Sequence, residues 1–255
     1  MNGRGHVIDY GTWPDQKRLR FTKRELRQTL ADATNANSFA ESIYAGLERL
    51  VEMLMSRQHE REGGGTLTID RIGVDAKWGQ STGTVRRFTR ECRFTGRVVP
   101  TMGQFVGAKS FQWQGVTNDK KTSPGLHCRM QPAKADPRVR EMLIDTNWWK
   151  SVIAERLSVG KGSEKAILLF DAKPHQHRMF ADHCCEETPS EEETKTGKKL
   201  IEWRQPPAAE NDFWDCLVGT CVWASWEGIK IDTEQEQRPQ KKNTRKRRKV
   251  TPLAC

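Results

Sequence analysis

The sequence lacks the long apolar runs that membrane insertion and secretion require. No segment approaches the roughly 20 apolar residues of a membrane span, and no apolar stretch of the signal-peptide kind follows the N-terminus. The seven cysteines are an odd number without the regular spacing of a secreted disulfide framework. These absences exclude membrane-spanning and disulfide-stabilised extracellular proteins, and they predict a soluble protein of the cell interior.

The phosphate-binding motif of P-loop ATPases, G-x-x-x-x-G-K-[ST], is also absent. The GKGS sequence at residues 160–163 has only a superficial similarity to it. We therefore expect no ATPase motor within this chain.

Positive charge is abundant but concentrated at one end. Eight Lys and Arg residues follow residue 237 without a single acid, so that residues 1–237 carry only +2 of the net charge of +10. We expect one folded domain over residues 1–232 and a disordered basic tail over residues 233–255, which are too polar to form a core. In this tail, Lys246, Arg247 and Arg248 are predicted to contact DNA phosphates.

Helix and strand signals alternate along the folded part, which favours an α/β fold. Short apolar or β-branched runs predict strands at residues 6–10, 67–74, 97–100, 139–146, 166–170 and 200–203. Apolar periodicity predicts helices at residues 39–54, 148–157 and 213–226, and Ser81 or Thr82 is expected to cap another one. We expect residues 66–75, 97–100 and 166–170 to share one sheet. We expect loops at residues 103–136, where a hairpin is the alternative, and at residues 186–199.

Two aspartates stand where this fold would present them at a site. Asp75 ends a mostly apolar strand, and the carboxyl ends of strands are where open α/β sheets bind ligands. Asp215 lies in the first turn of an otherwise apolar helix. Carboxylates suit Mg²⁺, and paired ions can clamp a phosphodiester. From the residues alone, a simple helix-dipole role for Asp215 is the stronger interpretation.

Two segments resemble a known family. Residues 71–103 (RIGVDAKWGQSTGTVRRFTRECRFTGRVVPTMG) are similar to the strand, Asp, Gly-rich turn, helix and Pro–x–x–Gly strand of lambda-type large terminase subunits of tailed phages. Residues 210–228 (ENDFWDCLVGTCVWASWEG) resemble the closing helix of the same nuclease domain, and IDTNWWKSVIAERL at 144–157 lies in the right order between them. The resemblance covers roughly residues 5–229.

The resemblance implies a ribonuclease-H-like mixed sheet flanked by helices, with three carboxylates holding two Mg²⁺ or Mn²⁺ ions. Asp75 and Asp215 match two of these acids. The acid of the first strand has no counterpart, because Asp9 and Asp70 lie at the wrong places. The chain is therefore expected to lack the first strands of the fold and, as an incomplete nuclease, to show little or no cleavage on its own. If it cuts DNA nevertheless, another acid must complete the site, and the first candidates are Asp9, Asp145 and Glu187.

The function implied is metal-dependent cutting of concatemeric viral DNA during packaging, in the host cytoplasm at the procapsid. The implied partners are double-stranded DNA, the portal protein, the terminase small subunit and the ATPase part of the terminase. The alternative is a truncated, non-catalytic module that binds DNA or portal. Lys77 and Arg86, close to Asp75, are candidate DNA contacts, although a solvated charged surface is the stronger interpretation of each.

Two further patterns compete with this interpretation. Zinc ligand types cluster in one segment, at His175, His177, His183, Cys184 and Cys185, but without the C-x₂₋₄-C spacing of structural zinc sites. Ordinary packing explains them better. The nine tryptophans could stack on bases, although most lie on apolar helix faces where burial in the core is expected.

Overall fold

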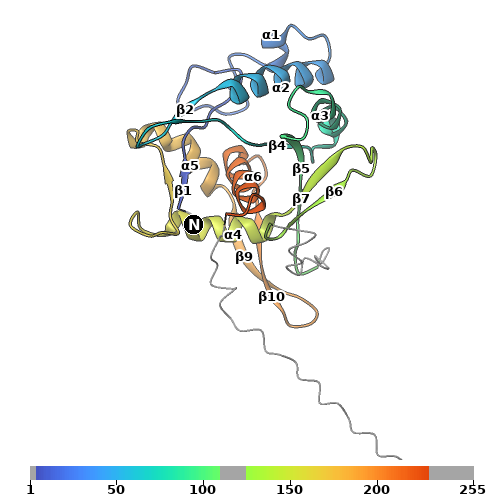
Figure 1. Ribbon diagram of the computed structural model, residues 1–255. Helices are drawn as coiled ribbons and strands as arrows, with labels where there is room; N and C mark the ends of the chain where they lie inside the picture. Colours follow the sequence, from blue (N-terminus) through green and yellow to red (C-terminus); the bar gives the residue numbers. More distant parts are fainter. Residues whose placement is uncertain (1–3, 110–124, 230–255) are drawn as a thin grey trace, which may run out of the picture.

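The computed structural model describes residues 4–109 and 125–229, which Figure 1 shows as ribbons. The expected basic tail, with Lys246, Arg247 and Arg248, lies outside the described residues. Within the described ranges, every helix is too short or too polar to cross a membrane.

A mixed four-stranded sheet forms the centre of the fold. Its order is β4 (Ile72–Asp75), β5 (Val98–Gln104), β7 (Arg140–Asp145) and β6 (Cys128–Pro132). The first three strands are parallel, whereas β6 runs antiparallel to β7. In this register Asp75 pairs with Thr101, and Asp145 pairs with Gln104. Both aspartates therefore stand at the carboxyl edge of the sheet, as expected for residues that end parallel strands.

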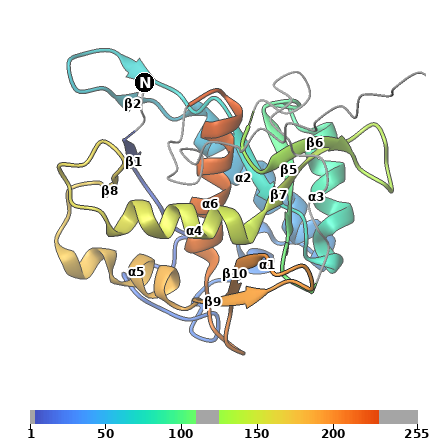
Figure 2. The same cartoon turned by 90° about the horizontal axis from the view of Figure 1, so that it is seen from below.

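Helices cover both faces of this sheet, and adjacent residues of β5 show why. Val98 belongs to a core with Val51 of α2 (Phe39–Ser56) and Phe88 of α3 (Gly79–Glu91). Its neighbour Val99 points the opposite way, into the larger core formed with α4 (Thr146–Ser158) and α6 (Asp212–Trp226). The alternation of side chains along a strand thus separates two hydrophobic cores. Figures 1 and 2 show that α4 and α6 cross each other.

Local sequence signals explain where some of the predicted helices begin. Ser38 caps α2 through a bond from the Glu41 amide to its hydroxyl, as expected. The helix α3, however, begins at Gly79, before the expected caps. The hydroxyl of Thr82 donates to the Ala76 carbonyl instead of capping an amide. The remaining helical segments are α1 (Leu30–Thr34), η1 (Pro174–His177) and α5 (Arg178–Cys185).

Three small two-stranded sheets surround the central one in the described part of the chain, and each of them corrects a sequence-based expectation. The run at 166–170 forms β8 (Ile167–Leu169), which pairs in parallel with β1 (Gly5–Val7) and not with β4 and β5. The expected common sheet is therefore wrong for this strand. Similarly, residues 66–67 of the expected strand form β3 (Thr66–Leu67), paired with β2 (His59–Glu60).

The acidic segment expected to be a loop is a strand. β9 (Thr188–Glu193) pairs antiparallel with β10 (Lys199–Arg204). Its side chains carry no apolar signal, but charge pairing across the strands stabilises the hairpin, with Lys199 Nζ 2.6 Å from Glu191 Oε1 and Arg204 Nη2 2.8 Å from Glu192 Oε1. A pattern search based on hydrophobicity cannot detect a strand of this kind.

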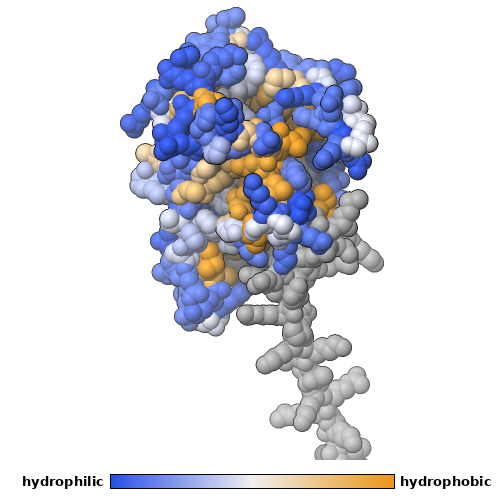
Figure 3. Space-filling view, turned by 90° about the vertical axis from the view of Figure 1, so that its left-hand side faces the viewer, coloured by the Kyte–Doolittle hydropathy of each residue, from blue (hydrophilic) through white to orange (hydrophobic). Residues whose placement is uncertain are grey.

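The surface matches the low apolar content of the chain. Figure 3 shows a mostly hydrophilic face with hydrophobic residues gathered near its middle. Isolated exposed apolar residues are common on soluble domains.

Candidate active site

The site is formed where the N-terminal end of α6 meets the carboxyl end of β4. The helix packs directly on the strand, and Gly73 permits this approach. A β-carbon at Gly73 would lie 2.4 Å from Nε1 of Trp223 on α6. Arg71 reinforces the contact, with its guanidinium 5.0 Å above the Trp223 ring. The contact between Trp223 and Gly73 fixes the position of α6 on β4.

Asp75 is exposed at the end of β4 and is held by its own turn. Its Oδ1 accepts a hydrogen bond from the backbone amide of Lys77 at 3.0 Å. An aspartate that binds the amide two residues onward favours this type of turn. The ammonium group of Lys77 donates to the carbonyl of Gly103 on β5. The loop after β4 is thereby tied to the neighbouring strand.

Asp215 lies in a polar network that connects three segments distant in sequence. Lys150 of α4 extends its Nζ to 2.5 Å from Oε1 of Glu187 and 2.9 Å from Oδ1 of Asp215. The side-chain amide of Asn211 donates to the same Glu187 oxygen at 2.5 Å and to Oδ2 of Asp215 at 3.1 Å. The Glu187 and Lys150 side chains are only 2% and 9% exposed, whereas that of Asp215 is 53% exposed. The network thus has a buried inner end and an open outer end.

The electrostatics indicate that Asp75 and Asp215 share one neighbourhood. Partial burial raises the pKa of Asp215; Lys150 opposes this rise, and the negative charges of Glu187 and Asp75 add to it. Burial likewise raises the pKa of Cys216 to about 11, with contributions from Asp212, Asp215 and Asp75. A carboxylate contributes in this way only when it lies near the affected group.

The donor set fits a hard divalent cation. Asp75 and Asp215 provide carboxylate oxygens from two different elements, which is the ligand type that Mg²⁺ and Mn²⁺ prefer. In an ionised carboxylate each oxygen has two acceptor positions. The contacts of Asp215 with Lys150 and Asn211 use one position on each oxygen, so its exposed side still has capacity to bind an ion.

Sequence reasoning predicted Asp75 and Asp215 as site residues, but it did not indicate most of the residues that contact Asp215. Glu187 was a candidate only as a substitute for a missing acid, and the structure places it in the cluster. Lys150 gave no distinct signal, because the same helix also carries the charged residues Glu155 and Arg156. Asn211 was expected to cap α6, but its side chain makes no capping bond and serves the acids instead.

The other two substitute acids lie in different environments. Asp9 pairs with Arg57, whose Nη1 is 2.5 Å from its Oδ2. Asp145 accepts from the Trp148 amide as the N-cap of α4, and its Oδ2 lies 3.1 Å from Nδ1 of His127. Both carboxylates therefore have local structural partners.

The two expected DNA contacts in the folded part differ in their surroundings. Lys77 is exposed beside Asp75. Arg86 instead forms an internal ion pair, with Nη2 2.7 Å from Oε2 of Glu141 and exposures of 15% and 3%. Because the guanidinium is committed to a buried acid, we do not include Arg86 in the proposed DNA surface.

The segment with zinc ligand types does not form a zinc site within the described residues. Both ring nitrogens of His177 have protein partners, the Tyr10 hydroxyl at 2.6 Å and the Phe170 carbonyl at 3.1 Å. Cys184 packs against the core, and burial raises its pKa to about 12, which disfavours the thiolate needed for metal binding.

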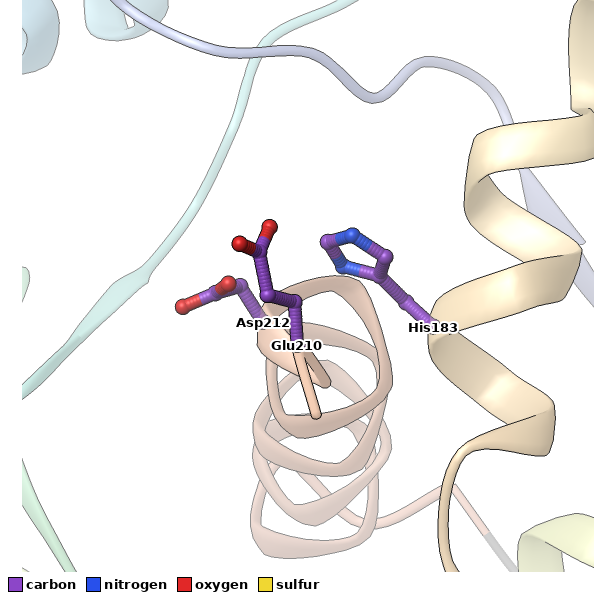
Figure 4. Close-up of side chains that lie close together, drawn as sticks. All are labelled: His183, Glu210 and Asp212. Atoms are coloured by element: carbon purple, nitrogen blue, oxygen red, sulfur yellow. The ribbon is translucent and has the colours of Figure 1, made fainter. Parts of the chain in front are cut away.

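A different group, His183, Glu210 and Asp212, brings three potential ligand atoms within 4.8 Å of one another (Figure 4). Its hydrogen bonds argue against a metal. The Phe213 amide donates to Nδ1 of His183, so a neutral ring carries its proton on Nε2 and retains no free lone pair. Lys23 binds both acids, through its amide to Glu210 at 2.8 Å and its Nζ to Asp212 at 3.0 Å. We assign this group to anchoring the start of α6.

Most of the described tryptophans are buried in the core or pack against it, as expected from their positions on apolar helix faces. Trp149, Trp214 and Trp223 are at most 5% exposed. Trp78 is an exception, because it is 56% exposed. It contacts Phe39 edge-on and follows Asp75 by three residues in the sequence.

Comparison with known proteins gives one family assignment. Residues 39–238 match the family model described as terminase large subunit gpA, endonuclease domain. Neither the curated proteins nor the solved structures contain a match.

Proposed function

Because the chain belongs to the family of terminase large subunit gpA endonuclease domains, we propose that it cleaves DNA with a divalent metal held by Asp75 and Asp215. The observation that supports the proposal is that burial, with a smaller contribution from an exposed acid at the end of β4, raises the pKa of a half-exposed acid on α6, next to the ion pair of Lys150 and Glu187. Mg²⁺ or Mn²⁺ suits these oxygen ligands.

A bound ion of this kind polarises a phosphodiester and lowers the pKa of a water molecule that attacks it. The residues of the chain prepare the site for that ion. The turn bond from the Lys77 amide orients Asp75. Lys150 and Asn211 each bind one oxygen of Asp215, and Glu187 holds both of these donors in place. Asp215 is therefore preorganised and need not reorient on metal binding.

We also propose that the fold is ribonuclease-H-like. Three parallel strands with helices on both faces, and acids at one edge of the sheet, are consistent with it. The substrate would be concatemeric viral DNA during packaging, and the partners would be the portal protein, the small subunit and the ATPase part of a terminase. Lys77 and the basic tail, including Lys246, Arg247 and Arg248, would bind DNA phosphates.

A plasmid-nicking assay with Mn²⁺ tests the proposal. The wild-type chain should relax supercoiled DNA, and Asp75→Asn or Asp215→Asn should reduce the rate at least about a hundredfold, as expected when an ion that polarises the substrate is lost. Asp70→Asn, at an exposed acid five residues before Asp75, is the matched control and should leave nicking unchanged.

Two results would contradict the proposal. Nicking that survives both substitutions would remove Asp75 and Asp215 from the chemistry. A wild-type chain that binds DNA but never nicks it would favour the alternative of a non-catalytic packaging module.

A further inference from the structure

Lys150 is a buried cation at the inner end of the acid cluster. Its side chain is 9% exposed, and its Nζ lies between Oε1 of Glu187 and Oδ1 of Asp215, at 2.5 and 2.9 Å. A lysine is rarely buried unless it is paired, since desolvation of an unpaired ammonium costs several kcal/mol. A divalent cation bound by carboxylate oxygens takes a comparable position between negative groups.

The two ends of the cluster differ in what remains available. Glu187 is 2% exposed, and one of its oxygens already accepts bonds from Lys150 and Asn211. It therefore faces the protein and its partners. Asp215 is half exposed and, with the exposed Asp75 nearby, faces solvent. Of these three acids, Asp75 and Asp215 are the ones open to an ion that arrives from solvent.

The charges lead to the same conclusion. When ionised, Asp75, Asp215 and Glu187 carry three negative charges, and the ammonium of Lys150 reduces the total to −2. One bound divalent ion brings this total charge to zero. A second would leave an excess of +2 in a partly buried site, next to an ammonium group that repels it.

We propose that Lys150 serves as a built-in cation in place of a second metal ion, so that this site binds a single divalent ion through Asp75 and Asp215. This inference rests on the proposed function. It assigns Lys150 and Glu187 a positioning role, because neither contacts the ion in this arrangement. It also changes the expectation from the family resemblance, which was a two-ion site.

Metal stoichiometry tests the inference without reference to cleavage. The full chain is titrated with Mn²⁺ by isothermal calorimetry, and the bound ions are examined by electron paramagnetic resonance for Mn²⁺–Mn²⁺ coupling. We expect one ion per chain and an uncoupled spectrum. Asp75→Asn and Asp215→Asn should each weaken the binding of that ion.

Two variants at the inner end sharpen the test. Lys150→Met removes the built-in cation and should tighten Mn²⁺ binding roughly tenfold or more, or admit a second ion, because a repelling charge is lost. The double variant Lys150→Met/Glu187→Gln keeps the total at −2 and leaves no buried carboxylate without its lysine. It should still bind a single ion, but more weakly than the wild type, because Asp215 loses the lysine that orients it. Lys161→Met, at an exposed lysine away from the acids, is the control.

The outcomes separate the inference from the proposed function. Two coupled Mn²⁺ ions in the wild-type chain would overturn the role of Lys150 and leave the nuclease proposal standing. Binding that ignores both aspartate substitutions, or no binding at all, would overturn the proposed function itself. If Lys150→Met fails to fold in a thermal melt, the wild-type stoichiometry and the double variant still decide the matter.

Discussion

Trp223 lies against Gly73 so closely that any side chain at this glycine would collide with it. A β-carbon there would stand 2.4 Å from Nε1 of the indole and 2.9 Å from Cγ2 of Thr101. Neither neighbour is the mobile end of a long side chain. This contact sets how near α6 approaches β4, and with it how near Asp215 comes to Asp75.

Gly73→Ala should therefore disturb both stability and the site. Overpacking a tight contact costs about 1–3 kcal/mol, and α6 can relieve the clash only by moving away from β4. We expect a lower melting temperature together with weaker Mn²⁺ binding by calorimetry. Gly83→Ala is the matched control, because a β-carbon at Gly83 in α3 meets no atom within 4 Å. This substitution should stabilise the helix by up to about 1 kcal/mol. A Gly73→Ala chain with unchanged stability would show that α6 tolerates a wider spacing.

The ion pair between Arg86 and Glu141 should contribute to stability and not to DNA binding. Removing one partner of a buried pair leaves an uncompensated charge and costs about 3–5 kcal/mol. Arg86→Met should lower the free energy of unfolding in urea by this order, and adding Glu141→Gln should recover much of the loss. Arg87→Met, at a neighbour with 54% side-chain exposure, should have little effect. A folded Arg86→Met chain with clearly reduced DNA affinity would restore this residue as a DNA contact.

Asp136 should make the protein sensitive to acid. Hydrogen bonds from Arg138 foremost, and from Arg90, lower the pKa of Asp136 from 3.8 to about 2. A group whose pKa is lower in the folded state stabilises the fold above its unfolded pKa, and this contribution is lost as the pH falls. In melts at pH values between about 3.8 and 2, Asp136→Asn should therefore flatten the decline in stability. Asp171→Asn, at an exposed acid, should retain the wild-type slope. Parallel curves for wild type and Asp136→Asn would contradict this linkage.

The basic tail should supply much of the non-specific DNA affinity. A chain ending at Asp232 lacks eight Lys and Arg residues. If all eight neutralised phosphates, the slope of log K against log salt would decrease in magnitude by up to about 7. Fluorescence anisotropy at several salt concentrations measures this slope, and circular dichroism checks that the domain remains folded. An unchanged slope would indicate another role for the tail, such as portal docking.

Much of the local structure follows from short-range signals in the sequence. Ser38 marks the start of α2, because its hydroxyl caps an amide three residues away. Asp75 was correctly placed at a strand end, and α4 and α6 begin within two residues of their predicted starts. The family was also recognisable, because its motifs, although short, occur in the right order. These features depend on neighbours in the chain, which sequence patterns describe directly.

The composition of the site was decided by tertiary structure. Lys150, Glu187 and Asn211 are far apart in sequence, and their side chains meet only because α4 and α5 both pack against α6. Each has an ordinary interpretation when taken alone, as a helix lysine, a loop acid and a helix cap. Long-range pairing likewise places β8 in a sheet with β1 and not with β4 and β5. It also explains why the acidic segment β9, which was expected to be a loop, is a strand. Patterns of hydrophobicity indicate which face of an element is buried, but the partner it meets depends on the chain as a whole.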